Sequence, residues 1–532
     1  MKYFTPRYGQ FLGWTLLLCG LLLWTVGCQV RPPVTMDVPP ADTGTSLSPE
    51  ASDPPGDTAP PPLISPPTDT GTSLPPEASD PPEDTAPPPL ILPPTDTGTS
   101  LPPETSPPPE DTVTPPPTLP PPSLSAGSIP VLSVTTEGQA LILSRLQYIE
   151  ATLTVHPTAD TVSGESIPLP CSIRARGHSS FHYCEDFTDY KSKNSYRIKM
   201  EESAALLPHK PGDKDRDWVL ISCKNDASAL RNHLVWDLAR RMDSLPYVTD
   251  YTWVELYING DYRGLYLLTE QIEVDGDRVD IDESACTDPA QVGYLLEYDF
   301  RGDIETNARE GLTYFYLPGT DIEWVIKSEV YTEAETAAVR AHLLTCHEAI
   351  LSGDRDRMEA LIDLPSFVDM FILQELSKNP DVGTSSFFVQ RDAGGKLCLT
   401  APWDFDFGFG TYSAGVSNLG LVTSGDKVPP HPWFAALMGQ KWFVEEVLSR
   451  MAEIRPFLEE TLTATESVAA VLTPASDRNH DRWGIYGTKY IKFVNDQVSV
   501  DLQSYEEHVA FLTQWTRLRF ARMEQALRKV LE

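Results

Sequence analysis

Positive charge is scarce in this 532-residue chain. It carries 41 Lys and Arg residues against 76 Asp and Glu residues, a formal net charge of -35. An acidic surface repels the phosphates of nucleic acids and anionic lipid headgroups. The composition therefore argues against nucleic acid as a partner, although it remains compatible with a local basic pocket for a phosphate-bearing ligand.

Cysteine pairs with the spacing of a zinc site are also missing. Two of the eight cysteines, Cys19 and Cys28, belong to the N-terminal leader, and none of the other six belongs to a CxxC pair or a Cys/His cluster. A metal–thiolate site is therefore not expected. Disulfides are compatible with an exported chain, but the sequence leaves their pairing open. The six cysteines are Cys171, Cys184, Cys223, Cys286, Cys346 and Cys398.

The N-terminus has the layout of a signal peptide. Lys2 and Arg7 precede an apolar run over 11–26, which is short for a membrane-spanning helix of about 20 residues. Cys28 directly follows Gly27, as in a bacterial lipobox, although a threonine stands where leucine is commonest. We predict a signal peptide over 1–27 and a lipid anchor on Cys28, hence an exported, membrane-anchored lipoprotein of a bacterial cell envelope. The alternative is an uncleaved signal anchor with an unmodified Cys28.

Residues 28–127 are rich in proline, threonine, serine and acidic residues. The sequence DTGTS begins at Asp42, Asp69 and Asp96, 27 residues apart each time, and no Lys or Arg occurs between Arg31 and Arg145. The repeat has no apolar face that stacking could bury, so it is not a solenoid unit. Proline favours the polyproline II conformation and like charges repel, which predicts a disordered, semi-stiff tether. Whether it carries O-glycans is open.

The first part of the body, which spans 128–532, has the pattern of β-strands. Short β-branched and alternating runs predict the strands, and Asn259-Gly260 between two of them predicts a tight hairpin turn. A helix is expected over 229–242. The expected strands are 129–134, 151–155, 172–177, 194–200, 253–258 and 262–268.

The second part reads as helical. Residues 337–352 and 365–378 have amphipathic spacing, and Pro365 suits a first helical position. One hairpin, 386–389 with 396–399, interrupts the helices. We therefore predict an α+β fold with a β-rich part over 128–330 and a helix-rich part over 331–532, an order compatible with a kinase-like bilobal architecture.

Three aspartates in the second part are candidates for chemistry. Asp381 follows a predicted helix, and Asp404 and Asp406 end a predicted strand among the aromatic residues of the segment WDFDFGFG. Paired carboxylates in apolar surroundings need a compensating cation or proton, and oxygen ligands suit Mg²⁺. A separate aspartate suits a base that accepts a hydroxyl proton. The plain alternative is that these acids cap helices or pair with arginine.

Basic residues gather in the first part. Lys193, Arg197 and Lys199 share one face of an expected strand by the period of two. Such a face is commonly just solvated, but it also suits the binding of phosphates, with an acid such as Glu270 fixing the lysine. Arg176 before a glycine can add a phosphate contact.

Several motifs occur in a fixed order, and together they resemble the CotH family of spore-coat atypical protein kinases. The resemblance covers 129–410 and continues weakly into the helical tail. The matching segments are RGHSS from Arg176, KNSYRIK from Lys193, DWVL from Asp217, Asn225-Asp226, Leu230-Arg231-Asn232, NGDYRGLY from Asn259, EQI from Glu270, Asn379-Pro380-Asp381, and WDFDFGFG from Trp403.

The resemblance implies a kinase-like fold and transfer of the γ-phosphoryl group of ATP, with Mg²⁺ or Mn²⁺, to serine or threonine of a cell-surface protein. It implies Asp381 as the catalytic aspartate, Asp404 as a metal ligand and Asp406 as a second candidate ligand. Glu270 would orient the lysine on the nucleotide side. Which of Lys193, Arg197 and Lys199 meets the phosphates stays open, with Arg176 as a further candidate. Asn225, Asp226, Arg231, Asn232 and Asn379 also match family motifs, and some of them could instead hold the two parts of the fold together.

Departures from the family pattern affect the nucleotide side. His178 stands where asparagine is usual, Asn194 replaces a common lysine, and an insertion that carries Cys184 precedes Lys193. No glycine-rich phosphate loop occurs, as in the family. The main alternative function is a non-catalytic interaction, adhesion or structural module on a kinase-like scaffold, because ATP is scarce outside cells. A polysaccharide hydrolase with paired carboxylates is a weaker third candidate.

Overall fold

The computed structural model describes residues 129–156, 167–177, 192–283, 288–300, 313–320, 322–328, 332–411, 421–424, 430–487 and 501–532. They belong to one compact unit, Pro108–Glu532. The predicted leader, the lipid anchor at Cys28 and the whole of the predicted tether lie outside the described residues. Within those residues, no helix combines the length and the apolar character needed to cross a bilayer. Cys171, Cys223, Cys346 and Cys398 are free thiols.

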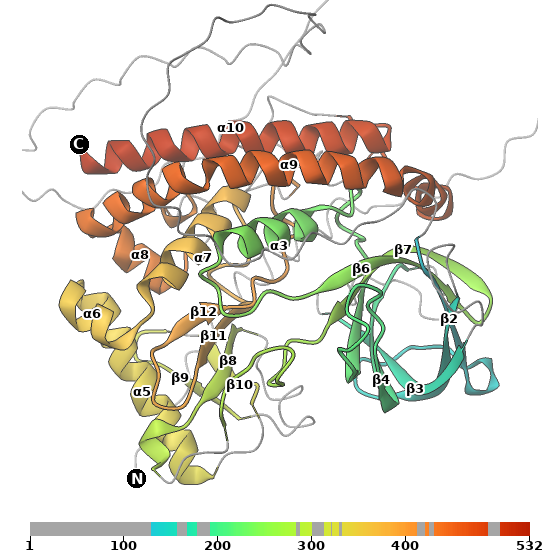
Figure 1. The fold of residues 1–532 in the computed structure, drawn as a ribbon, viewed down its shortest axis with the longest axis horizontal. Helices are drawn as coiled ribbons and strands as arrows, with labels where there is room; N and C mark the ends of the chain where they lie inside the picture. The colour runs from blue at the N-terminus through green and yellow to red at the C-terminus, as the bar shows by residue number, and fades with distance from the viewer. Residues whose placement is uncertain are drawn as a thin grey trace, which may run out of the picture. The chain divides into compact units, whose positions relative to one another are not determined.

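The N-terminal part of the unit is a closed β-barrel (Figure 1). Neighbouring strands follow the order β1-β2-β3-β4-β5-β7-β6, and β6 pairs with β1 in parallel to close the ring. The other strand pairs are antiparallel. The strands are β1 (Val131–Thr136), β2 (Ile149–His156), β3 (Ile167–Arg176), β4 (Ser195–Ala204), β5 (Asp215–Ile221), β6 (Tyr251–Ile258) and β7 (Asp261–Glu270).

Alternation along the strands separates the barrel interior from a charged exterior. Tyr196 and Ile198 of β4 belong to the buried interior cluster, whereas Arg197 and Lys199 between and after them point the other way, as the period of two predicted. The interior is filled by aliphatic and aromatic side chains with Cys171 among them. One consequence is that the basic residues of β3 and β4 share the outer face of the barrel.

The predicted hairpin between β6 and β7 is confirmed. Asn259 and Gly260 both adopt left-handed backbone conformations, with φ of 52° and 79°. A two-residue turn with positive φ at both positions matches the right-handed twist of the flanking strands, and Asn-Gly is the preferred sequence for it.

A second, five-stranded sheet joins segments that lie far apart in the sequence. Its order is β12-β11-β8-β10-β9, so that β11 from the helix-rich part pairs with β8. The hairpin predicted between 386 and 399 is therefore confirmed, but it belongs to a larger sheet. The strands are β8 (Tyr294–Asp299), β9 (Tyr314–Tyr316), β10 (Glu323–Ile326), β11 (Phe387–Arg391) and β12 (Cys398–Thr400).

Helices make up most of the C-terminal part, and α9 and α10 lie side by side along it (Figure 1). The mixed α+β fold, β-rich first and helix-rich second, is confirmed. The helices are α3 (Arg231–Met242), α5 (Glu333–Ser352), α6 (Arg355–Leu361), α7 (Leu364–Ser377), α8 (Pro432–Met438), α9 (Lys441–Trp483) and α10 (Tyr505–Leu531), with short 3-10 turns η1 (Glu137–Gln139), η2 (Pro289–Gln291) and η3 (Val422–Ser424).

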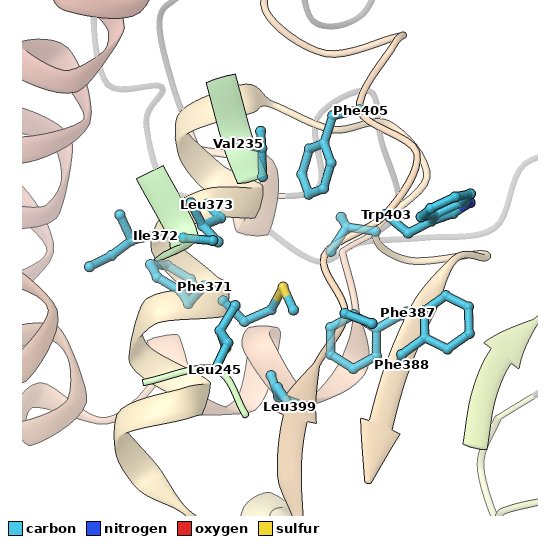
Figure 2. Close-up of a cluster of buried hydrophobic side chains, with 14 of the residues drawn as sticks. Val235, Leu245, Phe371, Ile372, Leu373, Phe387, Phe388, Leu399, Trp403 and Phe405 are labelled. Carbon is cyan, nitrogen blue, oxygen red and sulfur yellow. The ribbon is translucent and has the colours of Figure 1, made fainter. Parts of the chain in front are cut away.

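Helix α7 lies at the centre of the helix-rich part. It contacts α3, α9, α10 and β12, and every residue from Ser366 to Ser377 is buried. Asp363 caps its first turn, and Pro365 is the second residue of the helix, which begins one residue earlier than predicted. Figure 2 shows side chains of α7, α3, β11 and β12 meeting in one apolar cluster, with Trp403 and Phe405 from the following loop. The end of α7 is thus fixed by packing on all sides.

Candidate functional site

The loop after β12 carries Asp404 and Asp406. Trp403 and Phe405 are buried on either side of Asp404, and Phe405 lies beside Val235 of α3 (Figure 2). The two apolar side chains therefore anchor the loop while Asp404 and Asp406 stay partly exposed. Asp404 has a φ of 66°, a left-handed conformation that is uncommon for a residue with a side chain.

Left-handed residues concentrate around this loop. Besides Asp404, the described residues Lys378, Ser386, Ala401 and Phe409 have φ between 45° and 58°. Each such residue costs free energy and persists only where the surroundings fix it, and such residues cluster at functional sites. The backbone of this region is therefore held in a specific shape by tertiary contacts.

Residues at the N-terminus of α3 form some of the contacts that fix the loop with Asp404 and Asp406. Asn232 accepts a hydrogen bond from the Phe405 amide at 2.9 Å, and the Arg231 guanidinium donates to the Gly408 carbonyl at 3.2 Å. Arg231 also forms a buried ion pair with Asp226, which accepts from the Leu230 amide at 2.9 Å. Burial alone would raise the pKa of Asp226, but the pair with Arg231 holds it below its ordinary value. These three motif residues position the acidic loop.

Asp381 lies in the turn that follows α7. Asn379 is buried and accepts a hydrogen bond from the Asp381 amide at 3.1 Å. The Asp381 carbonyl accepts from the amides of Thr384 and Ser385, which closes the turn before β11. Ser386, the next residue, donates to the Asp404 carboxylate at 3.4 Å. The turn with Asp381 and the loop with Asp404 are thus adjacent.

Asp404 and Asp406 are close enough to repel each other. Burial raises the pKa of Asp406 well above its ordinary value, and the charges of Asp404 and, more weakly, Asp381 raise it further. The Asn225 amide donates to Asp406 at 3.1 Å and partly offsets this effect. The structure therefore brings together all three aspartates that the sequence singled out.

This carboxylate pair fits a divalent cation. A cation would relieve the repulsion, and Mg²⁺ typically uses one or two carboxylates together with substrate phosphates. Within the described segments no three His, Cys, Asp or Glu side chains form a ready-made cage for a metal ion.

Arg176 faces these acids from the barrel. Its guanidinium lies 5.4 Å from the centre of the Trp403 ring, and burial lowers the pKa of Arg176 to about 10 while the charge of Asp404 acts against that change. The end of β3 therefore reaches the acidic loop. Arg176 is the predicted basic residue that the structure brings to the aspartates.

The other basic candidates have partners in the protein. Arg197 forms an ion pair with Asp217 at 3.0 Å, and Lys199 lies 4.0 Å from the same carboxylate. Lys193 is buried and donates to the carbonyls of Ser222 and Leu265, the second at 2.6 Å. Burial lowers the pKa of Lys193 to about 7.

The lysine beside Glu270 is Lys210, which the sequence did not single out. Glu270 is fully buried and accepts from Lys210 at 3.0 Å and from the Tyr247 hydroxyl at 2.7 Å. Burial alone would lower the pKa of Lys210, but Glu270 and Asp250 hold it above its ordinary value. Lys210 lies in the loop between β4 and β5, where no periodic pattern marks a residue, so only the fold reveals the pair.

A groove of about 680 Å³ lies elsewhere, between β9 and α5. Tyr314 and Arg340 are among its lining residues, and none of the predicted site residues lines it. The candidate aspartates, on the loops after α7 and β12, therefore lie apart from this groove.

Fold and site together define a mixed α+β domain in which loops of a helix-rich part carry paired carboxylates and an arginine from a β-barrel faces them. Residues 173–523, more than half of the chain, match the family described as CotH kinase protein, so the chain belongs to the CotH kinase family. Membership indicates an atypical kinase that uses ATP. A search of the curated proteins found no match.

Proposed function

We propose that the protein is a membrane-tethered atypical kinase that transfers the γ-phosphoryl group of ATP to serine or threonine of proteins at the cell surface. The observation that carries this proposal is the convergence of Asp381, Asp404 and Asp406, which raises the pKa of Asp406, opposite Arg176. Family membership supports ATP as the donor. The kinase-like bilobal arrangement, with the barrel as the nucleotide-side lobe, is part of the proposal.

Asp381 is the proposed catalytic base. The acceptor hydroxyl oxygen forms a bond to the γ-phosphorus, the bond from that phosphorus to the β,γ-bridging oxygen breaks, and ADP leaves. The hydroxyl proton passes to the Asp381 carboxylate. Asn379 holds the backbone of Asp381 by a hydrogen bond of 3.1 Å, so the base starts from a fixed position.

Asp404 and Asp406 would hold Mg²⁺ or Mn²⁺, which neutralises charge on the phosphates when bound. Asn225 orients Asp406, and Asn232 and Arg231 fix the loop that carries both acids. Arg176 would bind a phosphate oxygen from the barrel side. Arg197 and Lys199 remain candidates for further phosphate contacts, which would compete with Asp217 for them.

The N-terminal segments complete the proposal. A lipid on Cys28 would anchor the chain in a membrane of the cell envelope, and the proline-rich residues 28–127 would hold the kinase away from it. Proline supplies stiffness and the acidic residues supply mutual repulsion, which together extend such a tether. The acceptor would then be a protein within reach of the membrane surface.

A non-catalytic interaction module is the second candidate. The observation that favours it is that Lys193 donates to two backbone carbonyls and Glu270 pairs with Lys210, so neither is arranged as the sequence comparison implied. On this reading the acids would stabilise a scaffold that binds a surface partner without turnover.

A phosphotransfer assay separates the two candidates. The purified protein is incubated with labelled ATP and Mn²⁺ or Mg²⁺, and Asp381→Ala and Asp404→Ala serve as controls. Label on the protein itself or on a generic acidic acceptor, lost in both variants, supports the kinase. Absence of transfer together with absence of metal-dependent ATP binding favours the scaffold.

A further inference from the structure

A buried glutamate at the end of α7 has an unusually complete set of partners. The Glu375 carboxylate accepts hydrogen bonds at 2.9 Å from the Val422 amide, the Thr423 amide and the Thr423 hydroxyl. It also pairs at 3.1 Å with Arg519 of α10, and both side chains are almost fully buried. Glu375 therefore joins two chain segments that lie 47 and 144 residues away from it.

Arg519 belongs to a face of α10 that runs along the site. It donates to the Glu375 carbonyl at 2.8 Å as well as to the carboxylate. One turn earlier, Trp515 packs edge-on against Phe409 at 6.0 Å, and the Phe409 amide donates to the Ser377 carbonyl at 2.6 Å. The last turn of α7 is therefore held by α10 and in turn holds the loop after Asp406.

The same turn of α7 leads directly to Asp381. Asn379, four residues after Glu375, donates its amide to the Gln374 carbonyl and accepts from the Asp381 amide. The segment 421–424 and the turn that carries the proposed base are thus both held by the last turn of α7. The basic residue that faces the acids, Arg176, comes instead from the barrel.

A buried ion pair is weak evidence for stability, because desolvation of both charges offsets their attraction. Hydrophobic residues of similar size commonly stabilise a core equally well. Besides Arg519, the partners of Glu375 are two backbone amides and one hydroxyl of a single short segment, and such contacts fix the position of that segment. The contacts of Glu375 therefore fix where the segment 421–424 lies, and they are not explained by a gain in stability alone.

We propose that Glu375 and Arg519 are positioning residues for the acceptor side of the reaction, since they hold the segment 421–424 in register with the turn that carries Asp381. This inference rests on the proposed kinase function. The acceptor hydroxyl must reach Asp381, so the acceptor polypeptide passes beside this turn, whereas ATP meets the barrel. Displacing 421–424 weakens acceptor binding and leaves ATP binding nearly unchanged.

The test compares Glu375→Gln with Asp369→Asn. Asp369 is an ideal control, since it is a buried acid of the same helix paired with an arginine, Arg450 of α9, at 2.8 Å, and none of its hydrogen-bond partners belongs to 421–424. With dephosphorylated casein as the acceptor probe, we expect Glu375→Gln to raise the KM for casein about tenfold and to change the KM for ATP less than about twofold. Asp369→Asn should change neither.

A milder variant guards against misfolding. Thr423→Val removes the hydroxyl bond to Glu375 and keeps both amides, and we expect it to raise the casein KM about threefold. If Glu375→Gln and Asp369→Asn lower the melting temperature alike and neither shifts the casein KM, Glu375 is only structural and the inference is overturned.

Hydrogen–deuterium exchange supplies a readout that needs no turnover. In Glu375→Gln the amides of Val422 and Thr423 should exchange at least about tenfold faster than in the wild type, and in Asp369→Asn they should not. If the wild type transfers no phosphate, the proposed function fails, yet faster exchange confined to 421–424 still supports the attachment. If the Val422 and Thr423 amides exchange at the wild-type rate in Glu375→Gln, the inference that Glu375 holds this segment is overturned.

Discussion

The barrel and the helix-rich part differ in whether their charged side chains are paired with opposite charges. On the barrel, basic side chains of β3 and β4 lie on the outer face, and Arg197 is matched by Asp217 at 3.0 Å. In the helix-rich part, Asp404 and Asp406 lie close together, and the pKa of Asp406 is raised by burial and by its neighbour. The barrel thus compensates its charges locally, whereas the acidic loop leaves a surplus of negative charge.

This difference in charge compensation indicates which part of the fold is shaped by function. Two carboxylates that repel each other destabilise a domain, so a site that keeps them needs a return in binding or catalysis. The left-handed conformations of Asp404 and Phe409 point to the same part of the chain. The barrel, in contrast, follows its local sequence pattern closely.

The largest expected effect is a loss of stability of the helix-rich part in acid, caused by a buried histidine. His431 stacks on Phe387 at 4.1 Å, and burial lowers the pKa of His431 to about 3. Below about pH 6.5 the unfolded chain binds a proton at His431, whereas the folded chain binds it only near pH 3. The contribution of neutral His431 to the free energy of unfolding is therefore fully present above about pH 6.5 and is lost as the pH falls toward 3. The loss for this one group reaches up to about 3 kcal/mol at pH 4.

Replacement of that histidine checks the argument. His431→Asn keeps an acceptor for the Trp433 amide at the start of α8, so the helix remains capped. Urea unfolding at pH 8 and pH 4.5 should show a lower stability at pH 8 but a smaller difference between the two pH values than in the wild type. An unchanged difference would mean that His431 is not a source of the acid sensitivity.

Removal of one of the repelling acids should separate activity from stability. Asp406→Asn removes the charge that burial and Asp404 disfavour, so we expect phosphoryl transfer to fall about 100-fold while the Tm rises by about 2 °C, or about 1 kcal/mol. Calorimetry at neutral pH without metal measures the second effect. A lower Tm would show that the pair is compensated in a way the geometry does not indicate.

The attachment of the barrel to the helices can be broken at one glycine. A Cβ on Gly264, which has a φ of 97°, would lie 2.1 Å from the side-chain oxygen Oδ1 of Asn479 in α9, and that oxygen accepts from the Leu265 amide. We expect Gly264→Ala to cost about 2 kcal/mol. Gly260→Ala is the control, since its φ of 79° is equally unfavourable but nothing lies within 4 Å, and it should cost about 1 kcal/mol. Equal costs would remove Asn479 as the cause.

The smallest effect tests the basic side of the comparison. Arg176→Met removes the charge that faces Asp404 and keeps an apolar stem against Trp403, so we expect the KM for ATP to rise about tenfold, as for one lost charged contact. Arg174→Met is the control on the same strand, because Arg174 stacks on Tyr148. A similar rise in both variants would mean that the whole strand face, and not Arg176, attracts the nucleotide.

Much of the fold was predictable because its signals are local. Alternation in β4, the Asn259-Gly260 turn and the proline at the start of α7 each depend on neighbouring residues only. The three aspartates were also found from sequence, since acids beside aromatic residues are conspicuous and the ordered motifs identify the family. The predicted helix 337–352 begins earlier, at Glu333, because Thr332 and Glu335 form a capping box.

The partners of charged groups were not predictable in the same way. Glu270 pairs with Lys210, 60 residues away in the sequence. Lys193 donates to the carbonyl of Ser222, just after β5, and to that of Leu265 in β7. Alternation states which face of a strand a residue occupies, but it does not state which loop covers that face. A lysine in an irregular loop therefore leaves no sequence signal.

By itself the sequence determined the family, a β-rich part followed by a helix-rich part, and the three candidate acids, because each of these depends on short runs of neighbouring residues. It gave no signal for β5, β8, β9 or β10. Only the tertiary structure decided that Arg176 faces Asp404 and that Glu375 joins α7 to Arg519 and to the segment 421–424. These contacts join residues more than 40 positions apart, and they exist only once close packing has fixed several helices and strands against one another.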